Sequence, residues 1–172
     1  MAFTLALTAS VQAQDRLERY DVFVGPSYAH HDIGHVPGMD VAGTVHLSKL
    51  FGVVGDFGLH RSGYYFGRKL QVYTYRFGPK LSVRKDGVTL FGQALAGASH
   101  ITGTTYISGK TLFETTLNEF NYHLGGGVDL ELSDWLSVRF ASGYSYQRFQ
   151  GFRTSGYQIL AGPVFRFGHL SN

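Results

Sequence analysis

The stretch Phe120–Tyr146 has the clearest alternation of apolar and polar side chains in the chain. Within Phe120–Leu132, apolar residues occupy every second position, and polar residues or glycines lie between them. After a tight turn at residues 133–135, the alternation resumes over Leu136–Tyr146. A repeat of two residues is typical of a β-strand, because successive side chains point to opposite faces of a sheet. The stretch therefore predicts a hairpin of two strands.

The two faces of this hairpin predict different solvents. Asp129, Glu131 and Arg139 all lie on one face, which otherwise holds small or polar residues. The opposite face is apolar along its length and aromatic at its ends. Such a face is too tall for the core of a small protein, whereas strands of transmembrane barrels turn such a face toward lipid. We therefore expect lipid on the apolar face and a polar interior behind the other.

Eight segments of this kind follow Tyr20, most of them near the roughly 9–11 residues of a tilted membrane strand. Their connections alternate between tight turns and long loops, which predicts an eight-stranded, antiparallel, up-and-down transmembrane β-barrel with turns in the periplasm and loops outside. An even strand count brings both termini to the periplasmic end. The phase of the fifth segment is ambiguous. The expected strands are Tyr20–Ala29, Met39–Ser48, Gly52–His60, Leu70–Arg84, Val88–Ala98, Glu119–Leu132, Leu136–Gln147 and Gly156–Phe167.

Composition agrees with a barrel. Charged residues make up 16% of the 172 residues, below the roughly 25% of soluble domains, and aromatic residues reach 15%. No apolar run approaches the roughly 20 residues of a membrane helix, which leaves a closed barrel as the spanning structure. The sequence has no cysteine, and its net charge of +3 is too small to indicate a nucleic-acid partner.

The first thirteen residues differ from the rest. Residues 3–11 are apolar with small side chains, and Val11 and Ala13 fit the small-residue pattern before a signal-peptidase cleavage site. No Lys or Arg precedes Arg16, so we interpret residues 1–13 as a truncated signal peptide and residues 14–172 as the barrel domain. The alternative is a buried N-terminal strand or helix.

The inward faces carry charges of both signs in similar number. Such charges must pair, because an unpaired charge in a low-dielectric interior is costly. Eight strands leave an interior that side chains can fill, so a polar plug is expected rather than an open channel. The predicted lumen charge network consists of Asp21, Asp40, Asp56, Arg76, Lys80, Arg84, Asp129, Glu131, Arg139 and Arg166.

Several glycine-rich stretches resemble the outer-membrane β-barrel domain family related to the membrane part of OmpA-like proteins. The last of them also resembles the C-terminal signal read by the barrel assembly machinery, although Leu160 departs from it. The resemblance implies a barrel in the bacterial outer membrane, with outer-membrane lipids and the assembly machinery as partners, and it implies no particular activity. The resembling stretches are Leu50–Gly58, Arg76–Ser82, Leu90–Gly97, Leu124–Asp129 and Gly162–Gly168.

Two groups of residues suggest chemistry. His30, His31, Asp32 and His35 lie close together in the first expected loop and offer ligands for a transition metal; the alternative is a solvated polar loop. His46 and Ser48 have the spacing of the histidine and serine of outer-membrane lipid A deacylases; the alternative is polar packing in the lumen. We expect no catalytic residue, no cofactor and no bound metal.

The third long loop, residues 101–117, is interpreted either as a contact surface for an unknown partner or as a hairpin that extends two strands beyond the membrane. The overall prediction is a structural or surface-interaction protein of the outer membrane. The alternatives are a narrow passive pore and, third, a lipid-modifying enzyme.

Overall fold

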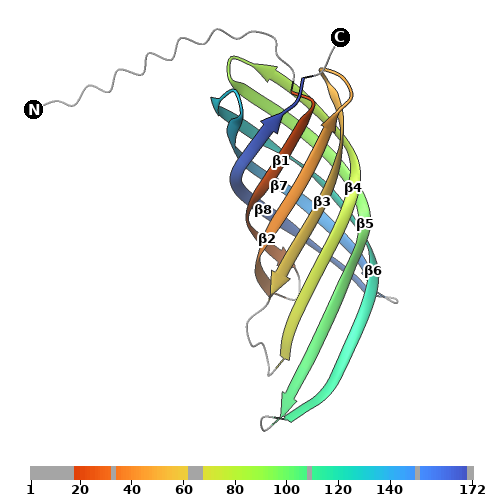
Figure 1. Ribbon diagram of the computed structural model, residues 1–172. Helices are drawn as coiled ribbons and strands as arrows, with labels where there is room; N and C mark the ends of the chain where they lie inside the picture. The colour runs from red at the N-terminus through yellow and green to blue at the C-terminus, as the bar shows by residue number, and fades with distance from the viewer. Residues whose placement is uncertain (1–17, 32–33, 62–67, 108–109, 150–151, 170–172) are drawn as a thin grey trace, which may run out of the picture.

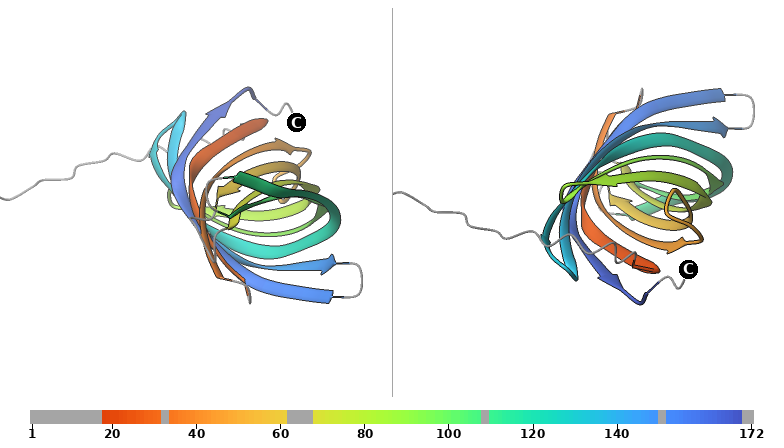
Figure 2. Two further views of the ribbon diagram at one scale, coloured as in Figure 1. Left: turned by 90° about the horizontal axis from the view of Figure 1, so that it is seen from below. Right: turned by 90° about the horizontal axis from the view of Figure 1, so that it is seen from above.

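The computed structural model describes residues 18–31, 34–61, 68–107, 110–149 and 152–169, and they form a closed antiparallel barrel (Figure 1). Neighbouring strands pair in sequence order, and β8 closes the ring on β1, with Tyr20 opposite Phe167 (Figure 2). The described part of the chain contains no helix that is long and apolar enough to cross a membrane. The strands are β1 Tyr20–His31, β2 Gly34–His46, β3 Phe51–Arg61, β4 Arg68–Lys85, β5 Val88–Ile107, β6 Lys110–Ser133, β7 Leu136–Phe149 and β8 Phe152–Phe167.

The two ends of the barrel differ. One end, called the turn end here, lies at the top of Figure 1. It holds the tight connections at 47–50, 86–87 and 134–135, the start of β1 and the end of β8. Asp86 and Gly87 have φ angles of 50° and 77°, which is the Asp-Gly chemistry of a two-residue hairpin turn. The opposite end, called the loop end, holds the other four connections.

Three of the four expected long loops were wrong, at 30–38, 99–118 and 148–155, because strands continue through most of each. β1 and β2 stay paired to His31 and Gly34, so most of the expected loop 30–38 is hairpin. β5 and β6 stay paired out to Ile107 and Lys110, so the two strands extend through residues 101–107 and 110–117.

The faces of β6 and β7 are oriented as predicted. Leu124 and Phe140 point outward and are exposed, whereas Asp129 and Arg139 point inward and are buried. The ambiguous phase of β5 is resolved: Phe91 and Leu95 face the lumen, and Leu90 faces outward.

Aromatic rings mark both margins of the outer surface. At the turn end Trp135 stacks on Phe165, and nearer the loop end Tyr122 stacks on Tyr146. Such bands are typical of the two membrane interfaces. The sequence also predicts Tyr64, Tyr65 and Phe66 at the outer interface, and these three residues lie outside the described part of the chain.

Candidate functional site

The ten charged residues expected in the lumen fall into a turn-end network and a loop-end network. Eight of them are buried, with side chains on seven different strands pointing inward. Glu131 and Arg84 lie at the turn-end rim, where their side chains are 19% and 30% exposed. The buried eight are Asp21, Asp40, Asp56, Arg76, Lys80, Asp129, Arg139 and Arg166.

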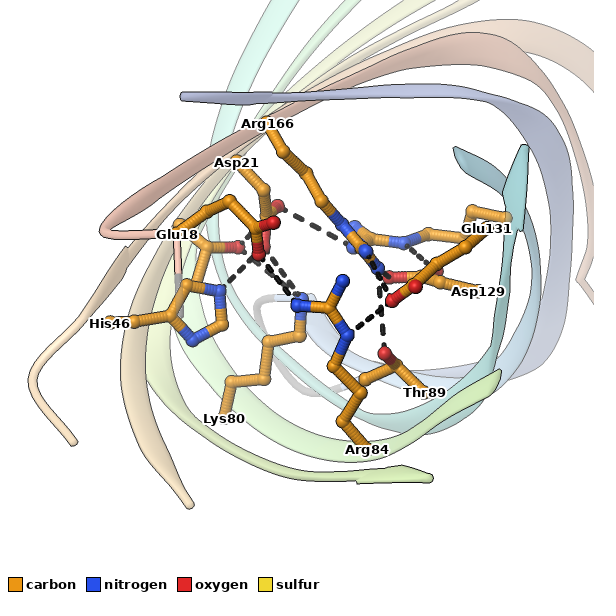
Figure 3. A network of polar contacts seen from close by, with 11 residues as sticks. Glu18, Asp21, His46, Lys80, Arg84, Thr89, Asp129, Glu131 and Arg166 are labelled. Carbon is orange, nitrogen blue, oxygen red and sulfur yellow. Dashed lines mark hydrogen bonds and ion pairs between the residues drawn. The ribbon is translucent and has the colours of Figure 1, made fainter. Parts of the chain in front are cut away.

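The turn-end network includes Asp21, Asp129 and Lys80 (Figure 3). Arg139 joins Asp21 to Asp129 at the centre of this network. Arg139 donates to both carboxylate oxygens of Asp129, from Nε at 2.7 Å and from Nη2 at 2.9 Å, and its Nη2 lies 3.4 Å from Asp21 Oδ1. Lys80 Nζ lies 3.3 Å from Asp21 Oδ2, and His46 Nε2 lies 2.8 Å from the same oxygen. When a guanidinium donates two hydrogen bonds to one carboxylate, the second bond strengthens the interaction and fixes the orientation of the two groups.

Charged residues at the turn-end opening of the lumen extend this network toward the solvent. Arg166 donates to Glu131 over 2.7 Å, and Arg84 pairs with both Glu131 and Glu18, the latter over 2.7 Å. Glu18 precedes the first strand and was not in the predicted network. In this network four cationic side chains face four carboxylates, so its charge is balanced. They are Lys80, Arg84, Arg139, Arg166, Glu18, Asp21, Asp129 and Glu131.

Arg76 is the centre of the loop-end network. Its Nε donates to Asp56 over 2.8 Å, its Nη2 donates to Gln158 over 3.2 Å, and its Nη2 lies 3.6 Å from Asp40. Gln158 in turn donates to Asp40 over 3.0 Å, and His60 Nε2 lies 3.5 Å from Asp40. Gln158 thus adds a hydrogen bond to the ion pair between Arg76 and Asp40.

An apolar layer lies between the two networks. On β1 Phe23 lies between Asp21 and Ser27, and on β2 Ala42 lies between Asp40 and Thr44, all on the inward face. The members of the apolar layer are Phe23, Ala42, Val54, Leu95 and Val164, with Leu160 packed against them.

Sequence reasoning missed the apolar layer because it considered only the charges of the inward faces. The signal was present on four strands, since four of the five apolar residues lie two positions from an inward charge, as Phe23 does from Asp21 and Val164 from Arg166. Glycines make room for the larger rings. A Cβ atom on Gly162 would lie 3.3 Å from Phe23 Cε2, and one on Gly125 would lie 2.6 Å from His123 Nε2.

Phe91 joins the apolar layer to the turn-end network. Its ring lies 4.6 Å from Lys80 Nζ and 4.7 Å from the guanidinium carbon of Arg139. A desolvated cation over an aromatic face is stabilised by the ring quadrupole. Both cations are therefore held between carboxylates and an aromatic ring.

Two of the four candidate metal ligands, His30 and His35, lie on the outer surface at the loop end. His30 and His35 are opposite each other on β1 and β2, and their Nδ1 atoms lie 2.9 Å apart. The His31 side chain and all of Asp32 lie outside the described residues. Among the described residues, no group of three or more His, Asp or Glu side chains is placed to hold a metal ion.

The expected same-face placement of His46 and Ser48 was wrong. β2 ends at His46, which contacts Asp21 in the lumen, whereas Ser48 is exposed and accepts the Phe51 amide over 3.1 Å. A bend replaces the strand after His46, so positions 46 and 48 do not share a face. Ser48 serves as a turn residue.

Comparisons with known proteins define the class of fold. No family model and no curated protein matches the sequence. Neisserial surface protein A has the same fold, with a TM-score of 0.68 at 11% identity over 86% of this chain and 97% of that protein. Ail, the attachment invasion locus protein of Yersinia pestis, matches with a TM-score of 0.59 at 16% identity, over 87% of this chain and all of Ail.

A third match is a major outer membrane protein from Thermus thermophilus, with a TM-score of 0.62 at 14% identity over 86% of this chain and 99% of that protein. These matches confirm the predicted fold. The chain has the fold of the small, OmpA-like, eight-stranded outer-membrane β-barrels.

Proposed function

We propose that this protein is a bacterial outer-membrane barrel with a closed lumen, whose role is structural or lies in surface contacts at the loop end. In this proposal the turn end faces the periplasm and the loop end faces outward, as short turns and long hairpins do in such barrels. The charge network stiffens the barrel, and no residue catalyses a reaction.

The observation that carries the proposal is the order of layers along the lumen. An ion that enters at the turn end meets Arg139 and Lys80 held by carboxylates, and then the apolar layer around Phe23 and Leu95. Apolar constrictions exclude water and thereby block ions. The loop-end network around Arg76 adds a second layer of paired charges.

The extended hairpin of β5 and β6 supports a role in surface contacts. It projects farther at the loop end than the other strands (Figure 1). Pairing between β6 and β7 begins at Phe120, so residues 110–119 of β6 pair only with β5. Strand edges of this kind are available to partners. The shared fold with Ail, which is named for attachment and invasion, is consistent with such a role.

The test is ion leakage from vesicles that contain the refolded protein. A boiled and unboiled sample on a gel first establishes folding. We expect a folded barrel and no release of trapped potassium above that of empty vesicles. Steady release by folded protein would favour the narrow passive pore instead, with Arg76, Arg139 and Asp129 as its selectivity residues. Protease cleavage of the β5–β6 hairpin on intact cells tests the orientation, because only an outward-facing hairpin is cut.

A further inference from the structure

Four rings form a cluster on the outer surface of the barrel at the loop end. The His30 ring centroid lies 4.4 Å from that of His35 and 5.0 Å from that of Tyr157, and Tyr28 lies 5.6 Å from His35. These side chains face away from the lumen, since Ala29, between Tyr28 and His30, is buried inside. They come from three adjacent strands, β8, β1 and β2.

The contact between His30 and His35 determines which hydrogen-bond donors the pair presents to a ligand. Their Nδ1 atoms lie 2.9 Å apart, so one Nδ1 carries a proton and donates it to the other. The accepting ring, which has no proton on Nδ1, then carries its proton on Nε2. Neither Nε2 atom has a hydrogen-bond partner within the part of the chain that the structure describes. The pair therefore presents at least one N–H donor, which suits an anionic oxygen.

An apolar groove of about 570 Å³ begins directly beside this pair. This volume lies within the roughly 300–1,000 Å³ of small-molecule sites. The groove crosses the outer face of β1, β8, β7 and β6, and small residues at its centre, Gly126, Ser142 and Ala161, leave the space. Tyr28 lines the groove and also stacks on His35, so the groove and the imidazole pair are continuous.

The height of the rings along the barrel indicates what surrounds them. Tyr20 lies at the turn-end margin, where it stacks on Phe167. His30 is ten residues farther along β1. At roughly 3.3 Å per residue and a tilt of about 40°, this separation corresponds to about 25 Å along the barrel axis. Since the apolar band of such barrels is roughly 25 Å tall, the imidazoles lie at headgroup level and the groove lies in hydrocarbon.

We propose that this surface binds one membrane lipid with a phosphate headgroup. The phosphate accepts a hydrogen bond from the Nε2–H that the His30–His35 pair presents, and one acyl chain occupies the groove beside Tyr28 and Ala161. A free anion would use only the imidazoles, whereas the lipid uses both parts of the surface. The inference rests on the membrane placement proposed above and adds a specific lipid class to it.

The test is native mass spectrometry of the folded barrel in detergent, titrated with phosphatidic acid that carries two 14-carbon chains. We expect one bound lipid. His30→Phe combined with His35→Phe keeps the rings but removes the N–H donors, and we expect it to weaken binding about tenfold, as loss of a hydrogen bond to a charged group does. Ala161→Phe fills the groove and is expected to weaken binding by a similar factor.

Matched controls separate these effects from general damage. His100→Phe changes an imidazole on β5 that bonds Asn118, and Ala94→Phe adds the same ring to the outer face outside the groove. Both are expected to bind lipid as the wild type does. The gel shift of each variant establishes folding, and wild-type insertion into vesicles tests the membrane placement separately.

Three results would overturn the inference for a correctly folded barrel. In the first, the two binding variants retain wild-type affinity. In the second, dimyristoylglycerol, which lacks the phosphate, binds as tightly as phosphatidic acid. In the third, inorganic phosphate displaces the lipid at equal concentration, which would leave an anion site without a role for the groove.

Discussion

The substitution Arg139→Met removes the most heavily bonded cation of the turn-end network. In the wild type, Arg139 makes two hydrogen bonds to Asp129, lies 3.4 Å from Asp21 and stacks over Phe91. Methionine retains much of the side-chain volume but none of the donors. The carboxylate of Asp129 then remains buried, with Arg166 at 3.9 Å as its nearest cation. The substitution therefore tests the effect of removing two hydrogen bonds and the nearer of two cations from a buried carboxylate.

The expected loss follows from the cost of such a charge. Removal of one partner of a buried ion pair typically costs about 3–5 kcal/mol, because the remaining charge stays desolvated. The free energy of unfolding of the Arg139→Met barrel is expected to fall by about this amount. The double variant Arg139→Met with Asp129→Leu is expected to recover most of the loss, since an apolar pair of similar volume leaves no unpaired charge.

The assay is urea unfolding of the refolded barrel in lipid vesicles. Trp135, the single tryptophan of the sequence, is exposed on the outer surface against Phe165 and reports the loss of the lipid environment by its fluorescence. A loss below about 1 kcal/mol, as for a surface ion pair, would refute the claim that this network is buried and desolvated. A double variant less stable than Arg139→Met would refute it too.

Four further variants test other parts of the structure. Phe23→Ala opens a cavity in the apolar layer and is expected to cost about 3–5 kcal/mol in the same urea assay. Gly143→Val places a side chain against the His123 ring and is expected to lower the urea midpoint, whereas Gly55→Val, which enters open space, is expected to leave it unchanged. Ser48→Ala is expected to cost about 1 kcal/mol through lost turn bonds and to leave the cell's lipid A unchanged by mass spectrometry.

The barrel was predictable from sequence because outward-facing residues of such barrels are apolar and lumen-facing residues are mostly polar, and the two kinds alternate along each strand. Along β6 and β7 this contrast is strong, and positions such as Leu124 and Asp129 were assigned to the correct faces. Along β5 the contrast is weak, since Leu90 and Phe91 are both apolar. There only the pairing with neighbouring strands resolves which residue is inside.

The site was less predictable than the fold. A strand pattern places Asp21 and Arg139 on inward faces, but their meeting across the lumen depends on barrel closure and side-chain reach. Glu18 precedes the first strand and has no alternation to reveal it. The pairing of His30 with His35 depends on the hairpin register, which could not be read from a segment interpreted as a loop.

Single-channel recording in a planar lipid bilayer tests the central claim, a closed lumen, most directly. The wild-type protein, shown to be folded by its gel shift, is expected to give no steady conductance. The double variant Phe23→Ala with Leu95→Ala thins the apolar layer and serves as the comparison, with conductance expected to appear if it folds. Steady, reproducible conductance from the wild-type barrel would contradict the account.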